Sequence, residues 1–214
     1  MLAGGGHSHA LLLRRWAMRP GLRPAATAIT LVSRSGSSLY SGMVPALVAG
    51  QLPPAACRID LRRLCIRAGV SFVQAEICGL DPLNRLLELR DRPSLAYELL
   101  SLDVGAITAT GSAPRGMNAP DGGPMAVKPL EPFLAWCDRL PAERALRIRG
   151  GGAAAVELAL ALRARGHACQ LLLRGDTLHL GSPAANRTGE RLLQRAGIAV
   201  RRHASADAEA DLLC

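Results

Sequence analysis

Two glycine-rich segments have the residue types and spacing that bind the phosphates of a dinucleotide. They are residues 4–9, GGGHSH, and residues 150–155, GGGAAA. A pyrophosphate needs a backbone that approaches closely, several N–H groups aimed at it, and the positive end of a helix dipole. A glycine turn between a strand and a helix supplies all three. The two segments therefore predict two dinucleotide sites.

The two segments match the Gly-x-Gly-x-x-Gly/Ala pattern unequally. The second fits through Gly150, Gly152 and Ala155, whereas the first has His9 where a small residue normally lets the helix pack on the strand. We interpret His7 and His9 as residues that cap the helix or flank the phosphates, with a metal pair as the alternative. For each segment, a glycine loop that binds no ligand is the alternative interpretation.

The elements around the turns are expected to alternate between strand and helix. Hydrophobic periodicity predicts helices at 9–18, 59–68, 153–165 and 190–196, a short helix within 41–50, and a polar loop at 33–40. Strands are expected at 27–32, 70–77, 85–89, 99–104, 146–148, 168–173 and 198–200. This order predicts an α/β fold of two Rossmann-like units with parallel sheets, the second inserted and incomplete.

Composition restricts the class of protein. The 214 residues, 49% of them hydrophobic, are enough for one large or two small cores. The longest apolar run, residues 153–162, is shorter than the roughly 20 residues that cross a bilayer, and Glu157 interrupts it. We expect no transmembrane segment and no signal peptide, and therefore a cytoplasmic protein, with a peripheral membrane location as the alternative.

Neither cysteine nor charge indicates another function. The six cysteines form no Cys-x-x-Cys pair, so we expect no metal site and interpret them as small buried residues. The net charge of +9 comes from dispersed arginines, Lys128 being the single lysine, and only 3% of residues are aromatic. This pattern is typical of a solvated surface and argues against nucleic-acid binding, although the charge would also attract an anionic cofactor.

Several ordered motifs together resemble one family. They are the two glycine segments, YSGMVP at 40–45, ID at 59–60, YELLSLDVG at 97–105 and VKPL at 127–130. They resemble the FAD-dependent pyridine nucleotide-disulfide oxidoreductase superfamily. The closest branch is akin to type II NADH dehydrogenases and is fused to, or encoded beside, selenide, water dikinase in some bacteria. The resemblance spans nearly the whole chain.

The resemblance implies a flavin-dependent oxidoreductase. Such an enzyme passes hydride from NAD(P)H to FAD and electrons on to a quinone or other small acceptor, and this branch implies association with selenide, water dikinase. The implied FAD contacts are Gly4, Gly5, Gly6, His7, Ser8, His9, Ser33, Arg34, Tyr40, Ser41, Gly42, Met43, Ile77, Asp103, Gly105 and Lys128. The implied nicotinamide-nucleotide contacts are Gly150, Gly151, Gly152, Ala153, Glu157 and Arg174.

Three of these residues have individual roles in the resemblance. Lys128 would stabilise negative charge on the reduced flavin, and Glu157 would touch the flavin or the nicotinamide. A surface position is the alternative for each. Asp103 belongs to the second FAD-contacting stretch, with a loop-capping aspartate as the alternative.

The chain also departs from the family pattern. Ser33 and Arg174 stand where an acidic residue normally binds ribose, and Arg174 would suit the 2′-phosphate of NADPH or no nucleotide at all. An unpaired buried guanidinium is costly, so Arg147 or Arg149 must reach solvent or a partner.

The resemblance predicts the division of the chain. We expect an FAD-binding domain at 1–115, a linker at 116–140 and a partial NAD(P)-binding domain at 141–214. Relatives are longer, so the chain is interpreted as a truncated member. The alternative function is a catalytically inactive nucleotide-binding or interaction module, accessory to selenium metabolism.

Overall fold

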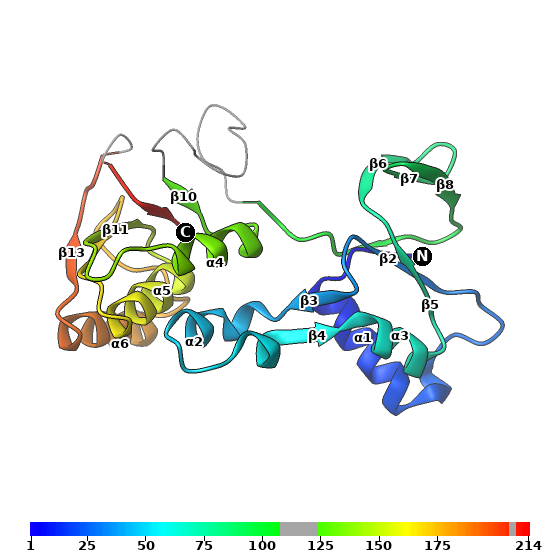
Figure 1. The fold of residues 1–214 in the computed structure, drawn as a ribbon, viewed down its shortest axis with the longest axis horizontal. Helices are drawn as coiled ribbons and strands as arrows, with labels where there is room; N and C mark the ends of the chain where they lie inside the picture. Colours follow the sequence, from blue (N-terminus) through cyan, green and yellow to red (C-terminus); the bar gives the residue numbers. More distant parts are fainter. Residues whose placement is uncertain (108–123, 206–208) are drawn as a thin grey trace. The chain divides into compact units, whose positions relative to one another are not determined.

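The chain forms two compact units. The computed structural model describes residues 1–107, 124–205 and 209–214 (Figure 1). Unit 1 comprises Met1–Tyr40 and Arg58–Gly105, and unit 2 comprises Ser41–Cys57 and Ala106–Cys214. Both are mixed α/β structures with a parallel sheet, which confirms the predicted fold class.

Unit 1 is built on a four-stranded parallel sheet. Its spatial order is β5 (Ser71–Gln74), β2 (Thr30–Ser33), β1 (Leu2–Ala3) and β9 (Ser101–Leu102). Numbered along the chain, these strands lie in the order 3-2-1-4, the order of a Rossmann half. The order reverses between β1 and β9, and ligands of such sheets bind beyond the carboxyl ends of the strands at this point.

Two layers cover the sheet of unit 1. Helices α1 (His7–Met18) and α3 (Leu61–Ala68) pack Leu13, Trp16 and Cys65 against Leu31. A separate antiparallel sheet of β6 (Ile77–Asp81), β7 (Leu86–Leu89) and β8 (Arg92–Ala96) forms a second cluster with Ala3 and Val32. The short strand β1 is therefore enclosed on both faces, and Leu2 and Ala3 are buried.

Two sequence predictions in unit 1 were wrong. The loop expected at 33–40 contains β3 (Ser37–Leu39), which pairs antiparallel with β4 (Arg58–Asp60). The helix expected from residue 59 begins only at Leu61, because the Asp60 side chain caps it by accepting the Arg63 N–H at 2.9 Å. Apolar periodicity carries no information about such a cap.

Unit 2 repeats the same strand order with one addition. Its parallel sheet is β10 (Met125–Ala126), β14 (Leu212–Leu213), β11 (Leu146–Arg149), β12 (Cys169–Leu172) and β13 (Ala199–Arg201). The last four strands of this row again read 3-2-1-4 from the β13 side, and β10 extends the edge beyond β14. The order reverses between β11 and β14.

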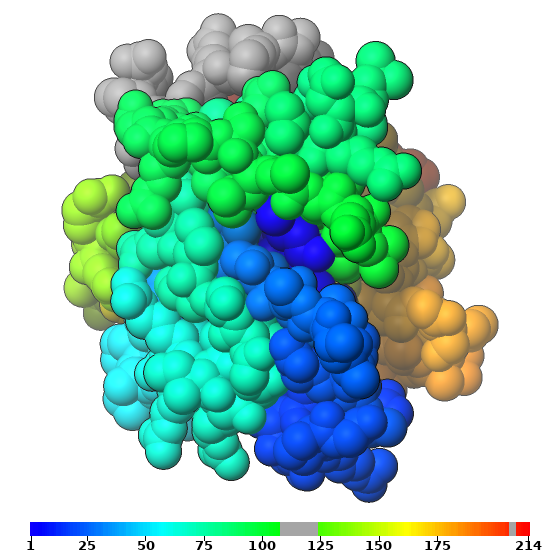
Figure 2. All heavy atoms as spheres, turned by 90° about the vertical axis from the view of Figure 1, so that its right-hand side faces the viewer, coloured from blue at the N-terminus to red at the C-terminus, as the bar shows by residue number. Residues whose placement is uncertain are grey.

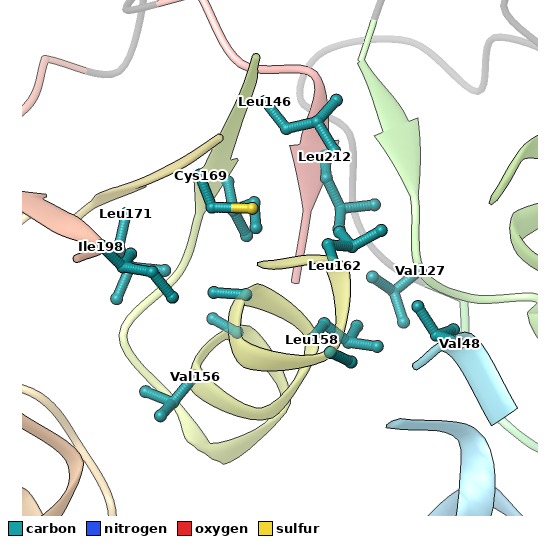
Figure 3. Packing of buried hydrophobic residues seen from close by; sticks show 14 of the residues in the cluster. Val48, Val127, Leu146, Val156, Leu158, Leu162, Cys169, Leu171, Ile198 and Leu212 are labelled. Atoms are coloured by element: carbon teal, nitrogen blue, oxygen red, sulfur yellow. The ribbon is translucent and has the colours of Figure 1, made fainter. Parts of the chain in front are cut away.

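Helix α5 (Ala153–Ala164) is the centre of the core of unit 2. It supplies Val156, Leu158 and Leu162, which pack with Leu146, Leu171 and Leu212 of the sheet (Figure 3). Val48 of α2 (Val44–Val48) and Val127 join the same cluster (Figure 3). The remaining helices of the described part of this unit are α4 (Leu130–Asp138) and α6 (Pro183–Arg195).

Other boundaries differ from the sequence predictions. Helix α6 starts seven residues before the predicted 190, because Ser182 caps it through the Ala185 N–H and Pro183 occupies its first position. Strand β9 is shorter than the predicted 99–104. The predicted linker, 116–140, contains β10 and α4, and its residues 116–123 lie outside the described residues. None of the helices described is long and apolar enough to span a membrane.

Candidate functional site

The first glycine turn joins β1 to α1 beside β9. The Gly4 N–H donates to the carbonyl of Val32 at 2.8 Å, and the Gly6 N–H donates to the carbonyl of Asp103 at 3.2 Å. Gly4 has a φ of +96°, and a Cβ there would overlap with the Asp103 backbone. The turn therefore requires glycine at residue 4. In Figure 2, which faces unit 1, the start of the chain is visible only as a small dark-blue area between blue and green atoms.

Ser33 lies directly behind this turn. It ends β2, is buried, and its Oγ would lie 2.9 Å from a Cβ on Gly5. Such a Cβ would also overlap with the side chain of Leu61. The end of β2 thus stands next to the turn, at the position where the family resemblance predicts ribose recognition, but it presents a hydroxyl instead of a carboxylate.

The ring of His9 is buried, with 2% of the residue exposed. Nδ1 lies 2.7 Å from the Gly4 carbonyl oxygen, and Nε2 lies 2.9 Å from the Ser101 hydroxyl oxygen. Because the carbonyl only accepts, Nδ1 donates its hydrogen to the Gly4 oxygen, while Nε2 and the Ser101 hydroxyl share the second hydrogen bond. The ring therefore ties the turn to β9 through the Gly4 carbonyl and the Ser101 hydroxyl, and the expectation that it flanks the phosphates stays a prediction.

The side chain of Asp103 reaches the start of α1. Its Oδ2 accepts the backbone N–H of His9 at 3.1 Å. A Cβ on Gly6 would overlap with this carboxylate. Asp103, which directly follows β9, thus caps the first turn of the helix, a contact that sequence spacing does not show.

Two of the predicted site residues stack on each other at the edge of the turn. The rings of His7 and Tyr40, both exposed, have centroids 4.9 Å apart and an interplanar angle of 24°. Of the other predicted residues in unit 1, Ile77 opens β6, Arg34 is exposed, and Gly105 has a φ of +84°. Ser8, in the first turn of α1, is exposed.

The second turn joins β11 to α5. A Cβ on Gly150 would lie 3.0 Å from the Cβ of Ala155, which explains why small residues stand at both positions. Gly152 has no atom within 4 Å of the corresponding point, so this part of the turn is open. Ala153 is exposed at the start of the helix.

A segment after β12 crosses the second turn. The His179 N–H donates to the Gly151 carbonyl at 2.7 Å. Arg174, which precedes this segment, is exposed, whereas the nearby Asp176 pairs with His203 at 2.6 Å. The Arg147 guanidinium forms an ion pair with Glu209 at 2.9 Å, in agreement with the expectation that this charge would find a partner. Arg149 is half-buried.

The three predicted flavin-side segments in unit 2 meet at one cluster. Val44, Val127 and Val156 belong to the same buried core, and α2 contacts α5. Each of these valines adjoins a predicted site residue in the chain. Val44 follows Met43, Val127 precedes Lys128, and Val156 precedes Glu157. Lys128 and Glu157 are exposed, as are Ser41 and Gly42. Packing therefore brings these segments together, although they are far apart in the sequence.

Sequence reasoning missed three residues that shape the turns. They are Ser101, which bonds His9; Leu61, which covers Gly5; and His179, which bonds Gly151. All three act across long sequence distances. Only the hydroxyl of Ser101, which interrupts the apolar residues 99–102, gave any signal in the sequence.

The buried cysteines have the properties of packing residues. Burial raises the pKa of the Cys65 and Cys169 thiols to about 11 and that of Cys137 to about 12. Within the described residues, no group of three or more histidine, cysteine or acidic side chains could hold a metal ion.

The strand orders and the two glycine turns define a protein of two Rossmann-like units. No protein-family model matches the chain, and no curated protein sequence matches it. Solved structures share its fold. An engineered water-forming NADPH oxidase bound to NADPH has a TM-score of 0.73 and 18% identity, and the match covers 100% of this chain and 52% of the oxidase.

Two further solved structures are similar to the same extent. The water-forming NADH oxidase from Lactobacillus brevis, bound to NADH, has a TM-score of 0.70 and 17% identity over 99% of this chain and 52% of its own. The sulfide:quinone oxidoreductase from Aquifex aeolicus has a TM-score of 0.71 and 16% identity, and the match covers 94% of this chain and 50% of the oxidoreductase. At these identities the similarity is one of fold, and the chain spans about half the length of these proteins.

Proposed function

We propose that the chain is a flavin-dependent oxidoreductase that passes hydride from NAD(P)H to FAD and electrons on to a quinone or other small acceptor. The observation that carries the proposal is the repeated arrangement of a 3-2-1-4 parallel sheet whose first strand leads through a glycine turn into a helix. The solved structures of this fold include oxidases bound to NADPH and NADH and a sulfide:quinone oxidoreductase.

The first turn is proposed to hold FAD. Two features support this proposal: Gly4, Gly5 and Gly6 leave no side chains of their own in the turn, and α1 presents the positive end of its dipole. The Ser33 hydroxyl would replace the usual carboxylate at the ribose, and the stacked rings of His7 and Tyr40 would flank the cofactor. Bound FAD would supply the two-electron chemistry.

The second turn is proposed to hold the nicotinamide nucleotide, with NADPH preferred. Gly152 leaves its part of the turn open, and Arg174 presents a guanidinium after β12 while Asp176 is engaged by His203. A guanidinium suits a 2′-phosphate. The engineered oxidase bound to NADPH supports this choice, since it derives from the NADH oxidase by substitutions that include an alanine to arginine.

Lys128 and Glu157, which both belong to unit 2, are proposed from the family resemblance to act near the flavin. The Lys128 ammonium would hold negative charge at the reduced ring, and Glu157 would orient the flavin or the nicotinamide. Lys128 and Glu157 directly follow Val127 and Val156, which belong to one core cluster, and this supports a location of both side chains in the same region of unit 2. Neither side chain has to act as an acid or base for hydride transfer between the two cofactors.

Reconstitution with FAD tests the proposal. Purified protein mixed with FAD and desalted is expected to keep the visible flavin absorption band, and anaerobic NADPH is expected to bleach it. A quinone or oxygen added afterwards should restore the band. Protein that is folded by circular dichroism but retains no flavin after reconstitution would contradict the proposal.

The alternative is a catalytically inactive nucleotide-binding or interaction module, accessory to selenium metabolism. The carboxylate of Asp103 at the first turn favours the interaction module, because a negative charge there opposes a diphosphate. Flavin that is bound but not bleached by either NADPH or NADH would support this alternative. Association with a selenide, water dikinase, proposed from the family resemblance alone, is tested by co-purification of the two proteins.

A further inference from the structure

The carboxylate of Asp103 occupies the end of α1 at which an anion would bind. The first N–H groups of a helix have no partner within the helix, and Gly6, the residue before α1, has no side chain to cap them. Asp103 Oδ2 accepts one of these N–H groups, that of His9, at 3.1 Å. Asp103 is thus the anion that complements the helix dipole in this structure.

A diphosphate at the same turn would need the same donors. Phosphates bind helix N-termini through the first-turn N–H groups and the dipole, and the Asp103 carboxylate uses one of these N–H groups, that of His9, together with the dipole. The overlap between this carboxylate and a Cβ on Gly6 shows that it lies against the turn itself. Two anions at this position would repel each other and compete for the His9 N–H group.

The backbone of Asp103 is held independently of its side chain. Its N–H donates to the Ala3 carbonyl at 2.8 Å, and its carbonyl accepts the Gly6 N–H at 3.2 Å. The neighbouring β9 is fixed by the bond between His9 and Ser101. The carboxylate can therefore leave the turn by rotation of the side chain, while the strand stays in place.

We propose that Asp103 is an internal competitor for the dinucleotide, and that FAD binds the first turn only when the Asp103 carboxylate leaves the His9 N–H. This inference rests on the proposed binding of FAD at the first turn. It reverses the expected role of Asp103, which the sequence had placed among the residues that bind FAD. Binding is an exchange of one anion for another, which lowers the affinity for the cofactor.

The variant Asp103→Asn removes the negative charge of residue 103 and keeps the size and shape of its side chain nearly constant. FAD and ADP binding to the full chain are measured by isothermal titration calorimetry. We expect the dissociation constant of each to fall by roughly tenfold, since the variant loses a charge-assisted cap and a like-charge repulsion. The matched control is Asp91→Asn, at an exposed turn of unit 1, for which both constants should stay within about twofold.

Amide hydrogen exchange gives a readout that needs no activity. In cofactor-free protein the His9 amide should exchange faster in Asp103→Ala than in the native chain, because the acceptor is gone. Addition of FAD should protect the amide in both proteins. Unchanged exchange of the His9 amide in Asp103→Ala would show that the carboxylate does not hold this N–H.

The outcomes separate this inference from the proposed function. If the native chain binds FAD and Asp103→Asn binds it equally or more weakly, the competition is wrong and the FAD site stands. If neither folded protein binds FAD, the proposed function fails, and the competition fails with it. Tighter binding by Asp103→Asn alone supports both.

Discussion

The Nδ1 atom of His9 lies 2.7 Å from the carbonyl oxygen of Gly4, so a ring from the helix is bonded to the turn that precedes the helix. Its Nε2 is bonded to Ser101, and the ring is buried. The residue that departs most from the glycine pattern is therefore the one that fixes the turn. A glycine or alanine at this position would leave both partners unbonded.

Replacement of His9 by alanine should destabilise unit 1. We expect a loss of about 2–4 kcal/mol of unfolding free energy from the cavity and from the unpaired Gly4 and Ser101 groups. Denaturant unfolding in a Trp136→Phe background, where Trp16 alone reports unit 1, measures it. The exposed His7→Ala change serves as the control and should stay within about 0.5 kcal/mol.

Replacement by alanine should affect stability strongly at one glycine of the turns and weakly at another. Gly4→Ala places a Cβ against the Asp103 backbone at a φ of +96°, so we expect a loss of about 3 kcal/mol or more. Gly152→Ala meets no atom within 4 Å and should stay within about 1 kcal/mol. Thermal unfolding of both proteins checks the difference, and equal stability would contradict the described geometry of the first turn.

Asp211 should contribute to the stability of unit 2. Its largely buried carboxylate accepts the Arg147 N–H at 2.8 Å and the Arg144 guanidinium at 2.9 Å. Asp211→Ala should cost about 1–3 kcal/mol, measured by denaturant unfolding. The control is Asp138→Ala, an exposed carboxylate 3.8 Å from Arg165, for which we expect less than about 1 kcal/mol.

Alkaline pH should destabilise the fold through the buried thiols. Burial raises the pKa of Cys137 to about 12 from an ordinary value of 9.0, so the unfolded chain loses this proton first. The resulting stability is complete below about pH 9 and is lost as pH rises toward 12. Unfolding free energies at pH 8, 9 and 10 should therefore decrease, with a shallower slope for Cys137→Ala. Cys78→Ala, an exposed thiol, should leave the slope unchanged.

Arg174 should decide the preference between the two nicotinamide nucleotides. If it binds the 2′-phosphate, Arg174→Ala should raise the dissociation constant of NADPH by roughly 10–100-fold and leave that of NADH within about threefold. Titration followed by nucleotide fluorescence measures both. The exposed Arg187→Ala change in α6 removes the same charge from unit 2 and should affect neither nucleotide. Equal losses for the two nucleotides would exclude a role at the 2′-phosphate.

Much of the fold follows from the sequence because the strands are buried and the helices are amphipathic. The glycine turns, α1, α5 and the strands that flank them lie within a few residues of their predicted positions. Helix α6 shows why boundaries fail, since Ser182 and Pro183 determine its start and its first turns are polar. Strands of two residues, such as β10 and β14, have no periodicity to detect.

The sequence predicts where the two glycine turns lie better than it predicts which side chains contact them. The spacing of the glycines locates both turns, but the bonds of His9 to Ser101 and of Asp103 to His9 join residues more than 90 positions apart. No local pattern encodes such a contact. The sequence therefore indicates which segments surround the turn and leaves open which side chain enters it.

The position of β14 has a consequence for synthesis of the protein on the ribosome. Residues 212–213 lie between β10 and β11 in the sheet, so residues 125–211 must be translated before the edge strand β10 can join β11 through β14. Unit 1 takes all its strands from the first 105 residues and can assemble while unit 2 is still being made. Until residue 213 has emerged, β10 and β11 have no neighbour between them, and the nascent chain exposes two open strand edges to the cell's chaperones.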